Sequence, residues 1–211
     1  MKKTIKVEGN AIIRRNPDRM DLSFTYRFQK EQYEEVLHLF EKSYRKFLDA
    51  LGKAGVVNEQ VKTAHFSVHP KYEEEYDGKK YHQAFKGFEI STDLHLRLPL
   101  SFPKLSEIFS ALSDSGETPQ VGLTFGLEDE KGLLEEVMKD AVLDAREKAQ
   151  VIAETLGLSL GHVISVEEVS ESYGSFTQAE GNPRLLKAMD LSLTPEDIEG
   201  KMKVLLTMEI L

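Results

Sequence analysis

The stretch MDLSFTYRF, residues 20–28, alternates apolar and polar side chains from end to end. A period of two predicts a β-strand with one buried face. Directly after it the apolar spacing changes to three and four residues, which predicts an amphipathic helix over residues 31–54, ended by Gly52 and Gly55. A strand and a helix that each carry one apolar face bury these faces against each other, so the stretch predicts a sheet with a helix packed on it.

The segment before this stretch, residues 5–13, alternates in the same way. A short connection around Pro17 separates the two segments, so we expect them to pair as antiparallel strands. Residues 64–72 and 88–98 also alternate, and a turn signal at residues 77–78 lies between them. They are therefore predicted to form a β-hairpin.

The register of this hairpin follows from its apolar residues. Apolar residues of the two strands face one another when the residue numbers of each cross-strand pair add up to 156. A register in which they add up to an odd number would place the apolar residues of one strand opposite polar residues of the other. We therefore expect Phe66 opposite Ile90, Val68 opposite Phe88 and Tyr72 opposite Ala84. The same register predicts a three-residue loop at 77–79.

The same two patterns, alternation for strands and a spacing of three and four residues for helices, predict the remaining elements. They are a helix over residues 101–116, a strand over 121–127, a helix over 129–156, and strands over 163–169 and 202–210. The order is ββαββαβαββ, and its middle is the βαββαβ arrangement of split-βαβ folds. The sequence therefore predicts an α+β fold, a mainly antiparallel sheet with helices packed on it.

Two further features concern the organisation of the chain. No linker or long repeat interrupts the order, so we expect a single domain over residues 1–211, in which residues 171–198 keep neither period and are predicted to be mobile. Small side chains recur every four residues along the longest helix, at Ala141, Ala145, Ala149 and Ala153. Such a row lets a backbone approach closely, and we expect that backbone to be the chain's own sheet.

Composition excludes several classes of protein. The chain has 27 basic and 36 acidic residues, and the resulting net charge of −9 opposes nucleic-acid binding. It has no cysteine, which excludes disulfides and thiolate metal sites. No apolar run approaches the roughly 18 residues of a membrane-spanning helix. Because no apolar segment follows Lys2 and Lys3, no signal peptide is predicted, and we expect a cytoplasmic protein unless a leader was removed.

Motifs of the common enzyme classes are absent from the sequence. It contains no Gly-x-Ser-x-Gly elbow, no glycine-rich phosphate loop and no His-Glu-x-x-His. The carboxylates of residues 73–75 lie at the predicted hairpin tip, where solvent prevents the separation of pKa values that a catalytic pair needs. We therefore expect no catalytic residue and no enzyme activity.

The histidines offer one candidate metal site. His65 and His69 lie on the polar face of the predicted hairpin, and the expected register places Asp93 diagonally across from His65. Diagonal neighbours are about 7 to 8 Å apart, which makes convergence on one ion difficult. A polar sheet face explains these residues better than a divalent-metal site, so we expect neither a bound metal nor a cofactor.

The predicted mobile segment offers a candidate ligand pocket. It contains the apolar side chains of Tyr173, Phe176 and Met189. A loop folded over the sheet could place these side chains around a small molecule.

Several short stretches, taken together, resemble one protein family. They are residues 7–9, 16–18, 22–28, 54–56, 61–63, 68–72, 141–149, 156–161 and 198–200. In this order they resemble the SIMPL domain family, a family of unknown function that includes bacterial periplasmic immunogenic proteins. The resemblance implies a βα-rich domain that tends to self-associate, and it supplies no agreed catalytic residues. Two features depart from the family: Asn10 and Ala11 stand where it often has a second glycine, and the usual secretory leader is missing.

Three functions remain open at this stage. The leading hypothesis is a non-enzymatic, self-assembling protein, a homo-oligomer that serves as an envelope- or stress-associated scaffold. The first alternative is a small-molecule-binding or enzymatic domain with a pocket under residues 171–198. The second is a protein-interaction module that captures a partner with the same segment.

Overall fold

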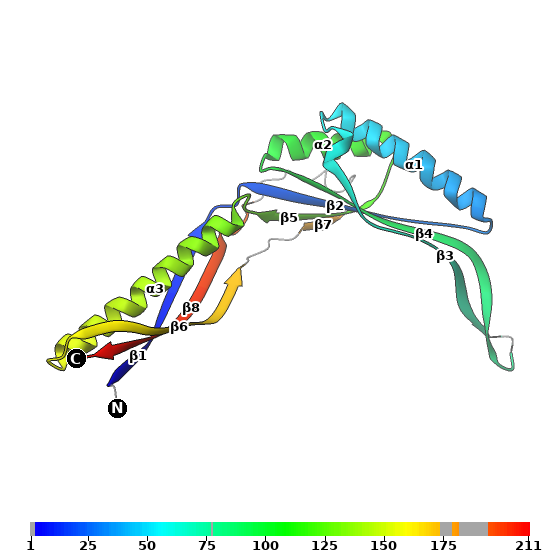
Figure 1. Cartoon of the computed structure of the whole chain (residues 1–211). Coiled ribbons are helices and arrows are strands. Elements are labelled where there is room, and N and C mark those ends of the chain that lie inside the picture. Colours follow the sequence, from blue (N-terminus) through cyan, green and yellow to red (C-terminus); the bar gives the residue numbers. More distant parts are fainter. Residues whose placement is uncertain (1–2, 77, 174–178, 182–193) are drawn as a thin grey trace. The chain divides into compact units, whose positions relative to one another are not determined.

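A computed structural model describes residues 3–76, 78–173, 179–181 and 194–211, and it describes side chains in these ranges except for 170–173 and 179–181. The elements are β1 Thr4–Arg15, β2 Arg19–Lys30, α1 Tyr33–Lys53, the 3-10 helix η1 Asn58–Gln60, β3 Val61–Tyr76, β4 Tyr81–Pro99, α2 Phe102–Ser115, β5 Gln120–Gly126, α3 Glu130–Thr155, β6 Leu160–Tyr173, β7 Ala179–Gly181 and β8 Ile198–Ile210 (Figure 1).

These elements form two compact units, each with its own sheet. The first unit is made of Met1–Asp18, Gly126–Phe176 and Pro195–Leu211, and the second of Arg19–Phe125 and Thr177–Thr194. In both units the sheet is antiparallel, and helices pack on it. The predicted α+β class is confirmed.

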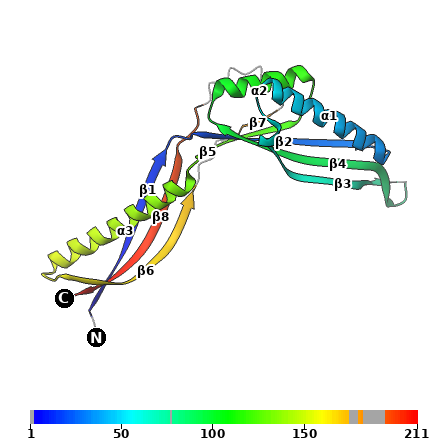
Figure 2. The same cartoon turned by 45° about the horizontal axis from the view of Figure 1, so that its top comes forward.

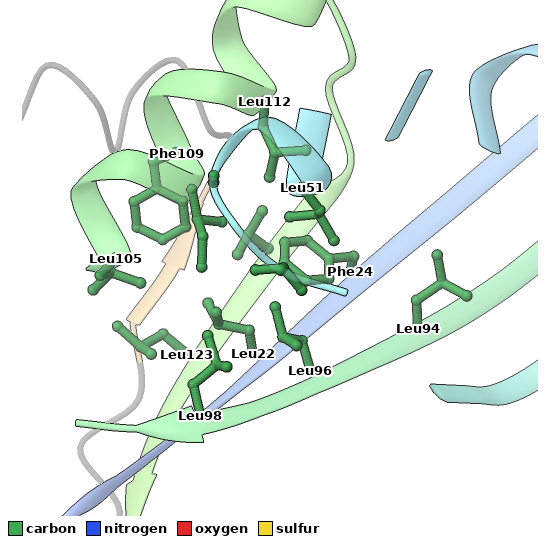
Figure 3. Packing of buried hydrophobic residues seen from close by; sticks show 14 of the residues in the cluster. Leu22, Phe24, Leu51, Leu94, Leu96, Leu98, Leu105, Phe109, Leu112 and Leu123 are labelled. Carbon is green, nitrogen blue, oxygen red and sulfur yellow. The ribbon is translucent and has the colours of Figure 1, made fainter. Parts of the chain in front are cut away.

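The second unit contains the predicted split-βαβ arrangement. Its five-stranded sheet has the order β3-β4-β2-β5-β7. Because β4 pairs antiparallel with both β2 and β3, those two strands run parallel with β4 between them. The helices α1 and α2 cover one face (Figure 2). Leucines of β2, β4 and β5 meet Leu51 of α1 and Phe109 of α2 in the core (Figure 3).

The ends of α2 follow from its sequence. The Ser101 hydroxyl accepts a hydrogen bond from the Lys104 amide at 3.3 Å. At the other end Gly116 has a φ of 78°, the left-handed conformation in which glycine is favoured. The predicted bounds of this helix are therefore confirmed.

One predicted strand pair is wrong. The strand β1 pairs with β8, and β2 pairs with β4, so residues 5–13 and 20–28 do not form a hairpin. The connection between them coincides with the boundary between the two units. Alternation identifies a strand with one buried face, but it does not identify the strand's partner.

The predicted register of the β3–β4 hairpin is also wrong, and its faces are correct only as far as Pro70, because Tyr72 lies opposite Phe85 and not opposite Ala84. Phe66 lies opposite Thr92, and Val68 lies opposite Ile90, a shift of two positions that keeps the same face. The turn connects Tyr76 to Tyr81 and so spans four residues, 77–80, instead of the expected three. Irregularities at Thr63/His65 and Pro70/Tyr72 change the register along the strands. The sequence prediction assumed one constant register for the whole hairpin and therefore could not include these changes.

The first unit is a three-stranded sheet of order β1-β8-β6, with α3 lying along β1 and β8 (Figure 2). All four alanines of the predicted row are buried. A side chain at Gly9 would collide with the Ala141 carbonyl and lie 2.6 Å from Cβ of Ala145. The row therefore lets α3 approach its own sheet closely, as the sequence predicts.

The outer edge of β1 is covered by side chains of α3. The backbone N–H of Asn10 donates a hydrogen bond to Oδ2 of Asp144 at 2.7 Å, and Nζ of Lys148 donates one to the backbone carbonyl of Glu8 at 3.1 Å. Lys148 also donates to Asp144 at 2.7 Å. The hydrogen bonds from Lys148 and from the Asn10 amide hold the pKa of Asp144 below its usual value. These contacts satisfy polar groups that an edge strand otherwise leaves open.

Replacing Asp144 is expected to reduce stability in a pH-dependent manner. A lowered pKa in the folded state means that the ionised carboxylate stabilises the fold above the unfolded pKa, and that this contribution is lost as the pH falls through the folded pKa. Asp144→Ala should therefore lower the free energy of unfolding at neutral pH by less than about 1 kcal/mol, because the group is partly exposed.

This difference should shrink as the pH falls from neutral toward about pH 2, because the wild-type carboxylate takes up a proton as the pH passes through its folded pKa. Urea unfolding of wild type and variant at both pH values measures it. Asp140→Ala, at an exposed aspartate one turn earlier, is the control. A difference that persists in acid would show that Asp144 acts through packing and not through its charge.

Candidate functional site

The predicted metal residues lie on the face of the five-stranded sheet opposite the helices. His65 lies directly opposite Asp93, closer than the diagonal position expected from the sequence. Oδ1 of Asp93 accepts a hydrogen bond from Thr25 at 2.6 Å. His69 lies further along β3, where its Nε2 is 3.5 Å from Oε1 of Glu89. Among the residues that the structure describes, no three histidine or acidic side chains are grouped to hold a metal ion.

Glu89 forms the main ion pair on this face. Its Oε2 accepts a hydrogen bond from Nζ of Lys71 at 2.8 Å. That bond is the main cause of the lowered pKa of Glu89, with smaller contributions from the charges of Lys71, His69 and Arg27. A carboxylate held in its ionised form suits an ion pair between strands better than proton transfer.

A shallow hollow of about 520 Å³ lies at one end of the same face. Its wall includes Lys62, His95 and Arg97, together with Asp21. Oδ1 of Asp21 accepts from Nε of Arg97 at 2.8 Å, and its Oδ2 accepts from Nε of Arg19 at 3.0 Å. The carboxylate is therefore occupied by two guanidinium groups and is not available as a general base.

The sequence-predicted ligand pocket cannot be located. The side chain of Tyr173 and the whole of Phe176 and Met189 lie outside the described residues. Most of the segment 171–198, predicted to be mobile, lies outside them as well.

The outer strand β6 exposes apolar side chains. It pairs with β8 on one side and forms the edge of the three-stranded sheet on the other. Val163, Ile164, Val166 and Val169 are between 46% and 53% exposed. An edge strand rich in exposed β-branched residues is a template for pairing with another chain. It is the part of this unit best suited to binding a further strand.

A second apolar surface lies on the β3–β4 hairpin, where the strands continue past the start of α1 (Figure 1). Tyr72 packs against Phe85 with ring centroids 5.6 Å apart, and Tyr76 against Tyr81 at 5.1 Å. All four are at least 50% exposed. The sequence prediction that this face is buried along residues 64–72 is therefore wrong, since Phe66 is 47% and Tyr72 56% exposed.

A signal for this exposed surface was present in the element lengths. A strand rises about 3.3 Å per residue and a helix about 1.5 Å. The 19 residues of β4 thus extend about 60 Å, against about 30 Å for the 21 residues of α1. One helix cannot cover a hairpin of that length, so its distal rings remain exposed.

Comparisons with known proteins confirm the family resemblance that the sequence indicates. The sequence model of the SIMPL family, described as a protein of unknown function, matches residues 5–208. The 26 kDa periplasmic immunogenic protein of Brucella melitensis biotype 1 is 25% identical over 188 residues, which cover 87% of this chain and 74% of the relative. The protein with the same name from Brucella abortus strain S19 gives the same identity and coverage.

Proposed function

This chain belongs to the SIMPL family of proteins of unknown function, and we propose that it is a non-enzymatic protein that assembles with copies of itself as a scaffold in the cell envelope. The observation that carries the proposal is the open edge of β6, with four half-exposed β-branched side chains.

The two edges of the three-stranded sheet differ in a way that supports self-assembly. Side chains of α3 cover the backbone of β1 at Glu8 and Asn10. The strand β8 lies in the centre of the sheet and has no open edge. The edge available for pairing is therefore β6. A second copy that adds its own β6 would bury the apolar side chains of both copies.

The names of the two Brucella relatives support an envelope location for this chain, since both are called periplasmic. Within the described ranges, no helix is long and apolar enough to cross a membrane. We therefore propose the periplasm or the envelope surface, in place of the cytoplasmic location expected from the N-terminal residues.

A small-molecule-binding protein is the second candidate. The hollow beside Lys62, His95 and Arg97 favours it, because the cationic side chains of Lys62 and Arg97 in a chain of net charge −9 would attract an anion. Stabilisation against heat by a small carboxylate or by phosphate, in a chain that stays monomeric, would support this candidate over assembly.

The edge of β6 is tested by a charged substitution. Val166→Lys should weaken assembly at least tenfold in dissociation constant, because pairing would bury the ammonium group against apolar side chains. Light scattering coupled to size exclusion measures the mass over a dilution series.

The control is Val151→Lys, the same substitution at a residue of α3 that is 61% exposed. It should leave the mass unchanged. A wild-type mass of 23.9 kDa at every concentration would exclude self-assembly. Equal effects of the two lysines would exclude β6 as the contact.

A further inference from the structure

The distal part of the β3–β4 hairpin carries a row of aromatic rings on one face. We call residues 70–76 and 81–88 the arm. Two further ring contacts extend the row beyond the Tyr72–Phe85 and Tyr76–Tyr81 pairs. The ring centroids of Phe85 and Phe88 are 5.5 Å apart, and those of Phe88 and Tyr33, at the start of α1, are 5.6 Å apart. The row therefore continues the helix-covered face of the sheet outward, past the point where α1 begins.

The other face of the arm is polar and held by ion pairs. Lys86 pairs with Glu75 across the strands, and Lys71 pairs with Glu89 at 2.8 Å. Each pair joins β3 to β4, so the arm has a fixed polar face and an exposed aromatic face. This division is the pattern of a sheet that packs its apolar face against another layer.

The exposed aromatic area is large enough for a specific contact. Tyr33, Tyr72, Tyr76, Tyr81 and Phe85 are 44% to 70% exposed. With about 200 Å² for each side chain, these rings expose about 550 Å². Two such faces in contact would bury about 1,100 Å², which exceeds the roughly 1,000 Å² expected of a biological interface.

Charge makes the arm compatible with a copy of itself. Residues 69–88, the arm together with its turn, contain four acidic residues and four lysines, so this segment is neutral while the whole chain carries −9. The acidic residues 73–75 lie on β3, whereas Lys79, Lys80 and Lys86 lie in the turn and on β4. When two arms meet face to face with their tips in the same direction, each β3 lies over the other copy's β4. Glu74, which shares the aromatic face with Gln83, then faces the Gln83 amide of the other copy.

The ring geometry argues against a flat ligand such as a polysaccharide. The planes of Tyr72 and Phe85 are inclined by 62°, those of Phe85 and Phe88 by 78°, and those of Tyr76 and Tyr81 by 43°. Inclined rings form ridges and not a level stacking platform. Ridges interlock with a second ridged surface, as edge-to-face aromatic pairs do in protein cores.

We propose that the arm is a docking surface for the arm of a second copy of this chain, packed with the aromatic faces together. The inference rests on the proposed self-assembly and adds a second contact, separate from the edge of β6.

A cross-linking experiment tests the orientation directly, because the chain has no cysteine of its own. Gln83 shares the aromatic face with Tyr81 and Phe85, and its neighbour His82 lies on the polar face. Packed sheets are about 10 Å apart, too far for a disulfide, so a short bis-maleimide is the probe. Gln83→Cys should give a covalent dimer at least tenfold faster than the matched control His82→Cys.

A second measurement tests the arm contact without the bis-maleimide cross-linker. Tyr72→Ser together with Phe85→Ser should raise the dissociation constant of the assembly at least tenfold, and Glu73→Ser together with His82→Ser on the polar face should not. Equal cross-linking of the two cysteine variants, or unchanged assembly of the aromatic double variant, would overturn the arm contact and leave the proposed function standing. Retention of the wild type on a polysaccharide column that the aromatic double variant abolishes would replace the second copy with a glycan. A monomeric wild type would overturn both proposals.

Discussion

Deletion of residues 203–211 is expected to leave the three-stranded unit unfolded. This segment is most of β8, which lies between β1 and β6 and pairs with both. It also supplies Val204, Leu206 and Met208, which are no more than 5% exposed. Burial of such side chains contributes about 1.5 to 3 kcal/mol each, against a typical net stability of about 5 to 15 kcal/mol. The truncated protein should be insoluble or bind a hydrophobic dye without a cooperative melt.

A control variant keeps β8 and changes only side chains on its outer face, which tests whether the effect comes from the buried face. Lys203→Ser with Thr207→Ser changes two side chains of β8 that alternate with the buried ones, and a cooperative melt should persist. A truncated chain that melts as cooperatively as the wild type would mean that β1 and β6 are held without β8.

The second large effect is expected at Phe47 of α1, in the core of the five-stranded unit. Its ring is fully buried and lies 4.9 Å from that of Phe24 and 5.8 Å from that of Tyr26. Phe47→Ala should lower the free energy of unfolding by about 3 to 5 kcal/mol through lost apolar contact and the cavity left behind. Urea denaturation of dilute protein, followed by circular dichroism, measures the loss.

The arm offers the same substitution at an exposed position. Phe85 is 50% exposed, so Phe85→Ala should change the stability of dilute protein by no more than about 1 kcal/mol. Comparable losses for the two alanine variants would mean that the aromatic face of the arm is already buried in the dilute chain.

Local signals predicted the elements well, because the residues that determine them are close in sequence. Ser101 and Gly116 mark the two ends of α2. The period of the apolar residues likewise separated the helices α1, α2 and α3 from the longer strands, although it did not indicate the short strand β7. The α+β class followed from this order alone.

Partners of strands that no turn signal joins could not be predicted, because alternation is the same for every strand with one buried face. Residues 5–13 pair with β8 at the other end of the chain, although residues 20–28 are nearer in sequence. The His65–Asp93 pairing was misplaced for a related reason. Irregularities in β3 and β4 shift the register where no sequence rule marks them.

The two candidate surfaces were also not predicted, since an apolar side chain has the same appearance in sequence whether or not something covers it. Tyr72 and Phe85 continue an apolar pattern that α1 is too short to cover, and only the element lengths reveal this. Val163 and Val166 continue the face on which α3 packs, but α3 lies over β1 and β8. Which copy or partner covers such residues is a property of the assembly and not of the single chain.

The covering of β1 by Asp144 and Lys148 determines how far an assembly through β6 can grow. Two copies joined through their β6 strands would form a continuous six-stranded sheet that ends in β1 on both sides. At Glu8 and Asn10 both terminal strands have backbone groups already bonded to α3, so strand pairing with a third copy there would have to break these hydrogen bonds. The sheet formed through β6 is therefore expected to stop at two copies, and further growth of the assembly would need a different contact, such as the arm.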